Sequence, residues 1–134
     1  MNHGTAIVLV AHGSKLAEAN ADAVSVAHAI RAGGGFHCVE AAFLEFTSPT
    51  IGEGIDACVR QGATRILILP YFLSLGAHVR RDLPAAVRDG EQRHPGVTIA
   101  MAEPLGFDAR LVELAMERID EALHARGWTP SGMA

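Results

Sequence analysis

Two histidines in this chain lie near strand-like apolar runs, in a setting typical of catalytic or metal-binding side chains. His12 stands next to Gly13, and His78 lies two residues after Gly76. A neutral imidazole binds transition metals and transfers protons near neutral pH. Glycine lets the backbone come close to a bulky ligand because it has no Cβ. Both histidines are therefore candidates for metal binding or acid–base catalysis.

Two carboxylates follow the other two apolar runs. Glu45 closes a hydrophobic stretch, where a carboxylate is costly unless it is paired or exposed. Glu103 follows the last such run and precedes Pro104. Imidazole and carboxylate together suit cobalt, nickel, iron or zinc. Each of the four runs is thus followed by a potential metal ligand or proton carrier.

The four apolar runs alternate with four helix-like stretches, which predicts an α/β fold. Continuous apolar runs are typical of strands buried on both faces of a parallel sheet. We therefore expect a three-layer α/β/α domain of the flavodoxin-like kind, with a four-stranded parallel sheet and right-handed crossovers. Ligands bind outside the carboxyl ends of such strands, so the candidates should share one edge. The strands are expected at 7–11, 38–46, 65–70 and 97–101.

Capping residues predict where the helices begin. Ser14 would cap a helix over about 17–31, and Ser48 with Pro49 would start the second. Asp82 would start the third and Asp108 the fourth. The fourth is predicted to be amphipathic, with a face for packing made of Leu111, Leu114, Ala115, Ile119, Ala122 and Leu123.

The loop after the third run contains apolar side chains where a surface loop is normally polar. Phe72, Leu73 and Leu75 could line a pocket for a flat apolar ring, or could pack beneath the loop as core. Arg80 and Arg81 follow in an otherwise acidic chain. They could hold an anionic substrate, or could be a solvated pair at a helix entry.

Structural alternatives exist for each candidate. His12 could hydrogen-bond the turn into the first helix, and His78 could be a surface histidine near a helix start. Glu45 could serve a structural role, and Glu103 could only organise a turn. We expect the remaining histidines to be solvated or structural: His3, His28, His37, His94 and His124.

Length and composition fit one globular domain. The 134 residues, 49% of them hydrophobic and 19% charged, predict a single domain over 1–134, with a core at about 6–126 and a tail at 127–134. A net charge of -4 argues against nucleic-acid binding. No signal peptide or membrane-length apolar run is evident, so we expect a cytoplasmic protein. Cys38 and Cys58 form no metal-ligand spacing and are expected to be buried, reduced thiols.

Four motifs, in order along the chain, resemble those of the CbiX/SirB class II chelatases. The resemblance runs from about Ile7 to Leu123. Four motifs in the family's order are specific, whereas a lone His-Gly-Ser would be weak. They are Val8–Ser14, Phe43–Glu45 followed by Pro49 and Ile51, Leu69–Val79 followed by Asp82–Pro84, and Ala102–Gly106.

The resemblance implies an enzyme that inserts a divalent metal ion into sirohydrochlorin, a tetrapyrrole with eight carboxylates. His12 and His78 match the family's two metal-site histidines, and Glu45 matches an acidic position near them. Short members look like half of a two-lobed chelatase, so a homodimer is implied. We expect the ring to contact Ser14, Phe72, Leu73, Ser74, Gly76, Arg80 and Arg81.

The metal would be a substrate, and no tightly bound cofactor is expected. We expect Co²⁺ insertion for cobalamin biosynthesis, with a siroheme ferrochelatase or a nickel chelatase as the alternatives. Outside this family, a phosphohistidine-type phosphohydrolase would need arginines beside His12, where only Lys15 is near. A non-catalytic metal carrier would use the same ligands but would not bind the ring.

Overall fold

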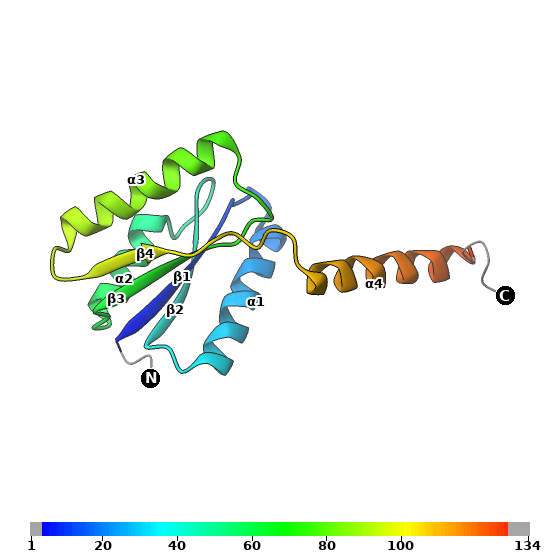
Figure 1. Cartoon of the computed structure of the whole chain (residues 1–134), viewed down its shortest axis with the longest axis horizontal. Coiled ribbons are helices and arrows are strands. Elements are labelled where there is room, and N and C mark those ends of the chain that lie inside the picture. The colour runs from blue at the N-terminus through cyan, green and yellow to red at the C-terminus, as the bar shows by residue number, and fades with distance from the viewer. Residues whose placement is uncertain (1–3, 129–134) are drawn as a thin grey trace.

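The computed structural model describes residues 4–128 and contains a four-stranded parallel sheet with the strand order β2-β1-β3-β4 (Figure 1). This confirms the predicted α/β class. His3 and most of the predicted tail, residues 129–134, lie outside the described residues. The elements are β1 (Thr5–Ala11), α1 (Ala17–Gly34), β2 (Cys38–Phe43), α2 (Ile51–Arg60), β3 (Arg65–Pro70), α3 (Ala77–Arg93), β4 (Thr98–Met101) and α4 (Ala109–Arg126).

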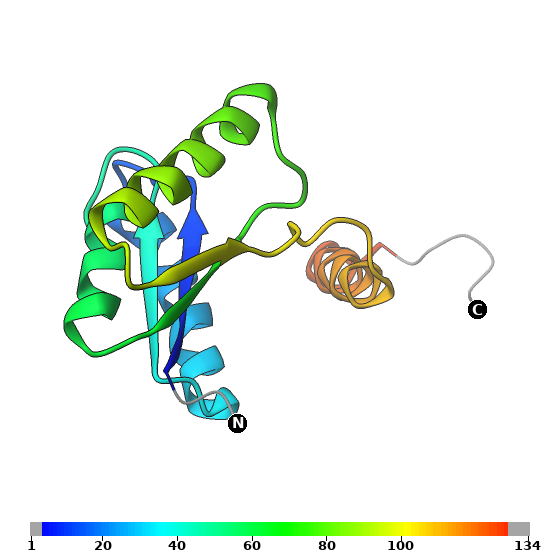
Figure 2. The same cartoon turned by 60° about the vertical axis from the view of Figure 1, so that its left-hand side comes forward.

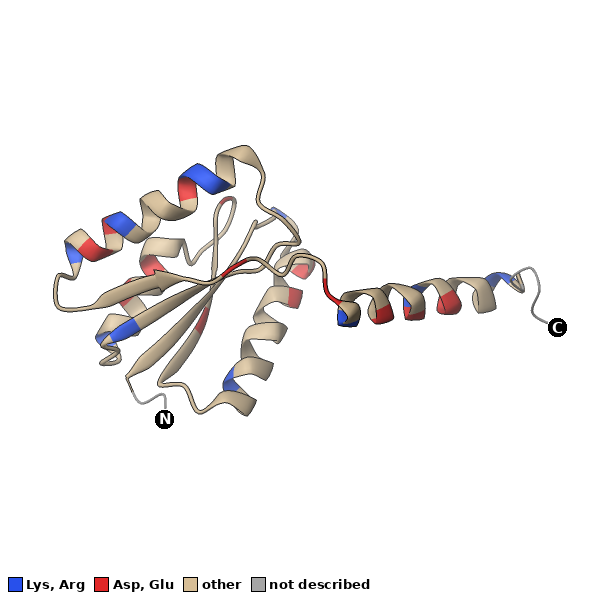
Figure 3. Cartoon of the chain, in the orientation of Figure 1, with Lys and Arg blue, Asp and Glu red and all other residues tan. Residues whose placement is uncertain are grey.

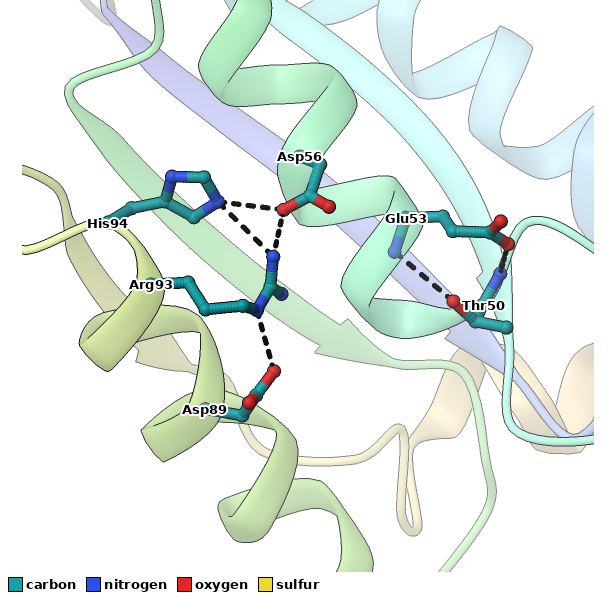
Figure 4. Close-up of polar contacts among 6 residues, drawn as sticks. All are labelled: Thr50, Glu53, Asp56, Asp89, Arg93 and His94. Atoms are coloured by element: carbon teal, nitrogen blue, oxygen red, sulfur yellow. Dashed lines mark hydrogen bonds and ion pairs between the residues drawn. The ribbon is translucent and has the colours of Figure 1, made fainter.

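Two predicted helix caps are wrong. The Ser14 hydroxyl accepts a hydrogen bond from the Leu16 amide ahead of α1, and α1 begins without a side-chain cap. The cap of α2 is Thr50 rather than Ser48, because Thr50 forms a reciprocal capping box with Glu53 (Figure 4). The chain between β2 and α2 is occupied by a turn with a cis peptide bond at Ser48–Pro49, and β2 ends at Phe43 instead of residue 46.

The third helix starts five residues earlier than predicted. Gly76 has extended backbone angles, and its carbonyl accepts the Arg80 amide in the first turn of α3. Pro84 therefore lies inside the helix, although proline lacks the amide that would bond to the Arg80 carbonyl. That carbonyl belongs to an exposed residue, where water can satisfy it. The cap predicted at Asp108 for α4 is confirmed, and the helix ends at Gly127, which has a left-handed backbone conformation.

One face of the sheet is fully covered and holds the larger core. Helices α2 and α3 pack on this face, and the side chains beneath them are almost completely buried. The opposite face is covered by α1 over β1 and β2 only. The covered face includes Val8, Val10, Ile66, Ile68, Ile55 and Leu83, and the α1 face includes Ile7, Leu9, Val39, Phe43, Ala23 and Ala27.

Helix α4 lies outside these layers. In both views it extends away from the sheet (Figures 1 and 2). Its predicted amphipathic pattern is present, but none of its residues is buried. Helix α4 therefore adds no buried side chain to the two cores, and the bounds of the domain stay a prediction.

An ion cluster joins α2 to the C-terminal end of α3, the opposite end of that helix from His78 (Figure 4). His94 Nε2 lies 2.7 Å from Asp56 Oδ1, Arg93 pairs with the same carboxylate, and Arg93 Nε lies 2.8 Å from Asp89 Oδ2. The hydrogen bond from His94, followed by that from Arg93, lowers the pKa of Asp56 below its ordinary value. As predicted, His94 has a structural role.

The two cysteines are buried and unlinked, as predicted. Their Sγ atoms lie 3.3 Å apart between β2 and α2. Burial raises the pKa of both thiols, which keeps them protonated and unreactive near neutral pH. Among residues 4–128, no helix has the length and apolar character needed to cross a membrane.

Candidate metal site

The turns that carry His12 and Glu45 are joined through their backbones. The Leu44 amide donates to the Ala11 carbonyl, and the Glu45 amide donates to the His12 carbonyl, each at 3.1 Å. These bonds continue the pairing of β1 with β2 beyond the strand ends. The position of Glu45 relative to His12 is therefore set by the sheet itself.

Glu45 faces both candidate histidines. One carboxylate oxygen, Oε2, lies 3.8 Å from His12 Nε2, and the other, Oε1, lies 3.9 Å from His78 Nε2. The three side chains come from the ends of β1 and β2 and from the first turn of α3. The structure thus brings together the three residues that the sequence selected for catalysis.

The spacing of these three side chains is somewhat wider than that of ligands on one ion. Metal–ligand distances of about 2.0–2.2 Å place two tetrahedral ligands about 3.4 Å apart. Within residues 4–128, no three His, Cys, Asp or Glu side chains are close enough to hold an ion as they stand. A small rotation of the exposed side chains would bring His12 and Glu45 to ligand spacing.

The imidazole of His12 packs edge-on against the Phe72 ring, with the ring centroids 6.5 Å apart. Phe72 is itself half-buried and packs against the core beneath α3, together with Leu75. The alternative that Phe72 and Leu75 pack beneath the loop as core is therefore correct in part. Phe72 also contacts a site residue, which limits the tilt of the His12 ring.

A hollow of about 570 Å³ lies between the β3–α3 loop and the segment that follows β4. Arg80 lies at this hollow, and its Nε also donates to the Leu75 carbonyl at 3.3 Å. Arg81 does not line the hollow and pairs with Asp82 on the surface. The predicted ring-contact residues Leu73, Ser74 and Arg80 share this hollow with Glu103.

Ser14 lies in a second hollow of about 380 Å³, which His12 and Gly13 also line. Its amide donates to the Asn20 side chain at 2.9 Å, and the Asn20 amide group donates back to the Ser14 carbonyl at 2.8 Å. Asn20 thereby fixes the backbone just after His12 and Gly13. Sequence analysis missed Asn20, although an amide side chain in the first turn of a helix after a His-Gly-Ser motif is a usable signal.

The remaining candidates are not part of the three-residue cluster. Glu103 lines the larger hollow but forms no ion pair with His12 or His78. Gly76 caps α3 next to His78, on exposed backbone. Among the other histidines, His37 contacts the Gln61 carbonyl. Ring binding by the predicted residues stays a prediction.

Comparison with known proteins gives the same family that the sequence motifs resemble, and the match extends along most of the chain. The family model described as CbiX matches residues 6–122. The sirohydrochlorin cobaltochelatase of Sulfurisphaera tokodaii is 34% identical over 119 residues, which cover 89% of this chain and 94% of that protein. The sirohydrochlorin ferrochelatase of Priestia megaterium is 39% identical over 116 residues, which cover 87% of this chain but 44% of that protein.

A solved structure of a longer relative has the same fold. The sirohydrochlorin chelatase SirB from Bacillus subtilis subspecies spizizenii, in complex with cobalt, superimposes with a TM-score of 0.82 at 33% identity. The match covers 87% of this chain and 50% of that one. This chain therefore spans about half the length of its ferrochelatase relatives and nearly all of its cobaltochelatase relative.

Proposed function

Because the chain belongs to the CbiX family, we propose that it inserts a divalent metal ion into sirohydrochlorin. The observation that carries this proposal is the placement of Glu45 within 4 Å of both His12 and His78 at the carboxyl edge of the sheet. The names of the relatives supply the substrate class, since both ferrochelatases and cobaltochelatases among them act on sirohydrochlorin.

The proposed chemistry has three requirements that these side chains can meet. The metal must be held without being trapped, and two neutral imidazoles leave coordination positions open for the ring nitrogens. The two pyrrole N–H protons must leave, and His12 and His78 are bases that each lie within 4 Å of the Glu45 carboxylate. The anionic ring must be held, and Arg80 at the larger hollow offers a cation for a substrate carboxylate.

We propose Co²⁺ as the metal, with Fe²⁺ and Ni²⁺ as the alternatives. The support for cobalt is the short cobaltochelatase relative, which this chain matches along 94% of its length. Iron is supported by the ferrochelatase relative, which has the higher identity of 39%. Ligand type alone does not choose, because an imidazole and carboxylate site follows the general affinity order of these ions.

We propose that the working enzyme is a homodimer. The chain corresponds to about half of SirB, so two copies would supply the equivalent of both halves. The expectations of a cytoplasmic location and of no tightly bound cofactor stay predictions alongside it.

The test is a metal-insertion assay in which the absorbance of sirohydrochlorin is monitored. Co²⁺, Fe²⁺ and Ni²⁺ are supplied in parallel reactions. We expect the insertion rates of the His12→Ala and His78→Ala variants to fall to the spontaneous rate with all three metals. The matched control is His28→Ala, on the exposed surface of α1, which should insert metal at the wild-type rate. Folded His12→Ala and His78→Ala variants with wild-type rates would refute the assignment.

Ring binding separates the enzyme from a metal carrier. A sirohydrochlorin titration monitored by absorbance should saturate with the wild-type protein in the absence of metal. A protein that binds Co²⁺ but leaves the ring spectrum unchanged would instead be a carrier.

A further inference from the structure

Phe46 is a bulky residue held in a strained backbone conformation beside the candidate site. Its φ is 70°, and it is the only non-glycine residue among residues 4–128 with a positive φ. The Thr47 amide donates to the Glu45 carbonyl at 2.9 Å, which closes a three-residue γ-turn with Phe46 at its centre. A bulky residue at positive φ is a conformational outlier, and such outliers cluster at ligand-binding sites. The strain at Phe46 therefore requires a functional explanation.

The loop that carries Phe46 is fixed by backbone hydrogen bonds. The Phe43 amide donates to the Pro49 carbonyl at 2.9 Å, and the Glu45 amide donates to the His12 carbonyl at 3.1 Å. Consecutive Cα atoms are about 3.8 Å apart, so Phe46 begins next to Glu45, whose carboxylate faces both candidate histidines. Phe46 is nevertheless 58% exposed. The loop thus presents a flat apolar ring to solvent at the edge of the candidate site.

Lys15 places a cation beside this ring. Its ammonium group lies 5.4 Å from the centroid of the Phe46 ring. Lys15 is exposed, is the only lysine in the chain, and forms no ion pair within residues 4–128. Charged side chains lie mainly on the helices, and the strands carry few (Figure 3). A cation on the loop after β1 is therefore well placed to meet an anion at the carboxyl edge of the sheet.

The contact between Lys15 and Phe46 does not by itself explain the strain. An exposed cation–π contact is a weak interaction, and it contributes less than a bulky residue at positive φ costs. A larger gain is available if a ligand covers the exposed ring and offers an anion to the ammonium group. Such a ligand would be flat and apolar at its centre and anionic at its rim, which describes a tetrapyrrole with carboxylate substituents.

The strand order places this pair on the other side of His12 from the larger hollow. The order is β2-β1-β3-β4, so the loops after β2 and after β3 lie on either side of β1. Phe46 belongs to the first loop, and Leu73, which is 57% exposed, belongs to the second. Arg80 lies at the hollow on that second side. Each side of His12 therefore offers one exposed apolar side chain and one cation, with Lys15 as the cation on the β2 side.

We propose that Phe46 and Lys15 form a subsite for sirohydrochlorin, in which the Phe46 ring packs against the macrocycle and the Lys15 ammonium group pairs with one of its carboxylates. This subsite rests on the proposed function. The carboxylates of a tetrapyrrole surround its rim, so a macrocycle centred over the candidate site meets cations on two sides, at Arg80 and at Lys15. The γ-turn holds the Phe46 ring in place before the substrate arrives, which reduces the entropy lost on binding.

The first test is the affinity for metal-free sirohydrochlorin, measured by absorbance titration. Phe46→Asn should raise the Kd at least about fivefold, because it removes the flat ring. Asparagine tolerates a positive φ, so this variant should be at least as stable in urea as wild type. Phe46→Tyr keeps the ring and should bind with wild-type affinity. Equal affinities of Phe46→Asn and wild type, or equal losses in Phe46→Asn and Phe46→Tyr, overturn the contact with the macrocycle.

The second test is the salt dependence of the same affinity. Lys15→Gln should raise the Kd about three- to fivefold at low ionic strength, and its affinity should fall less with added salt than that of wild type. The kcat for metal insertion should change little, because the ion pair holds the rim of the macrocycle and not its centre. Arg31→Gln, at the exposed far end of α1, is the matched control and should bind like wild type. A Lys15→Gln variant with the wild-type Kd at every salt concentration overturns the ion pair.

The third test uses Lys15 as a chemical probe, since the chain contains no other lysine. The Arg31→Lys variant supplies a reference lysine on the same helix, and both are acetylated with an N-hydroxysuccinimide ester and followed by mass spectrometry. Saturating metal-free sirohydrochlorin should slow the acetylation of Lys15 several-fold and leave the reference lysine unchanged. Equal acetylation of Lys15 with and without the macrocycle overturns the subsite.

The outcomes separate the subsite from the proposed function. If wild type binds the macrocycle and inserts metal, and the Phe46→Asn and Lys15→Gln variants do so with the same affinity, the subsite alone is overturned. If the macrocycle protects Lys15 but no metal is inserted, the proposed function alone fails. A wild-type protein that leaves the absorbance of sirohydrochlorin unchanged refutes both.

Discussion

Gly13 lies against the carbonyl of Glu45 so closely that no other side chain fits between them. A Cβ at position 13 would overlap with the Glu45 carbonyl oxygen and would lie 3.2 Å from the Phe43 Cβ. Gly13 also has a φ of 94°, which other residues rarely adopt. The contact lies beside the hydrogen bond from the Glu45 amide to the His12 carbonyl. Glycine at position 13 is therefore a condition for placing Glu45 next to His12.

Gly13→Ala should destabilise the protein by about 2 kcal/mol or more, from the positive φ and the overlap together. It should also reduce metal insertion in the fraction that folds, because the Glu45 turn must move. Urea unfolding and the absorbance assay measure the two effects. Gly33→Ala in α1 is the control, since nothing lies within 4 Å of its Cβ position, and it should be neutral or slightly stabilising. Equal stability of the two variants would contradict this interpretation.

Glu45→Gln should lower the rate of metal insertion by about 10- to 100-fold, because it removes the charge that both imidazoles face while keeping the shape. Stability should change by less than about 1 kcal/mol, since all three side chains are about half exposed. Glu103→Gln is the comparison, because Glu103 lines the larger hollow and should affect ring affinity more than rate. If Glu103→Gln lost the rate and Glu45→Gln did not, the two roles would be reversed.

Substitutions of Arg80 and Arg81 should differ in their effect on the binding of sirohydrochlorin. Arg80 lines the larger hollow, so Arg80→Gln should raise the KM for sirohydrochlorin several-fold with little change in kcat. Arg81 pairs with Asp82 on the surface, so Arg81→Gln should leave the KM near the wild-type value. Steady-state kinetics at fixed metal concentration measures both. A larger effect at Arg81 would place the ring outside this hollow.

The Asp56 cluster predicts a pH dependence of stability that is independent of the site. Its partners lower the pKa of Asp56 below 3.8, so the stabilisation is complete above that value and is lost as the pH falls through the pKa in the folded state. Because Asp56 is about one-third exposed, the effect should be roughly 1 kcal/mol or less.

Asp56→Asn tests this dependence by urea unfolding from neutral to acidic pH. The variant should be less stable than wild type near pH 7, and the difference should disappear under acidic conditions. Glu91→Gln, on the exposed surface of α3, is the control. A difference that persists at low pH would mean that packing, and not charge, explains the loss.

The strands and the three-residue cluster could be predicted from the sequence because they follow general rules. Buried parallel strands are short continuous apolar runs, and their carboxyl ends meet at one edge, which places His12 and Glu45 together. The caps at Ser14 and Ser48 were wrong because several hydroxyl residues compete near a helix start. Thr50 prevails because Glu53 stands three residues later to complete a capping box.

The features that the sequence did not reveal depend on contacts between distant residues. The two hydrogen bonds between Asn20 and Ser14 depend on how the first turn of α1 packs against the loop after β1. The position of α4 could not be read from its amphipathic pattern, which is the same whether the helix packs on its own sheet, on a second copy or on nothing. Helical spacing says which face is apolar but not what will cover it.

The exposure of the candidate site has a consequence for how substrates arrive and leave. The side chains of His12, His78 and Glu45 are 52%, 56% and 40% exposed, so bulk water reaches all three in the free protein. An ion held there would keep part of its hydration shell and could be exchanged rapidly. A flat macrocycle laid across the site would displace that water and provide the wall that the protein lacks. The substrate would in this way serve as its own lid, and departure of the metallated ring would reopen the site to solvent without a moving loop.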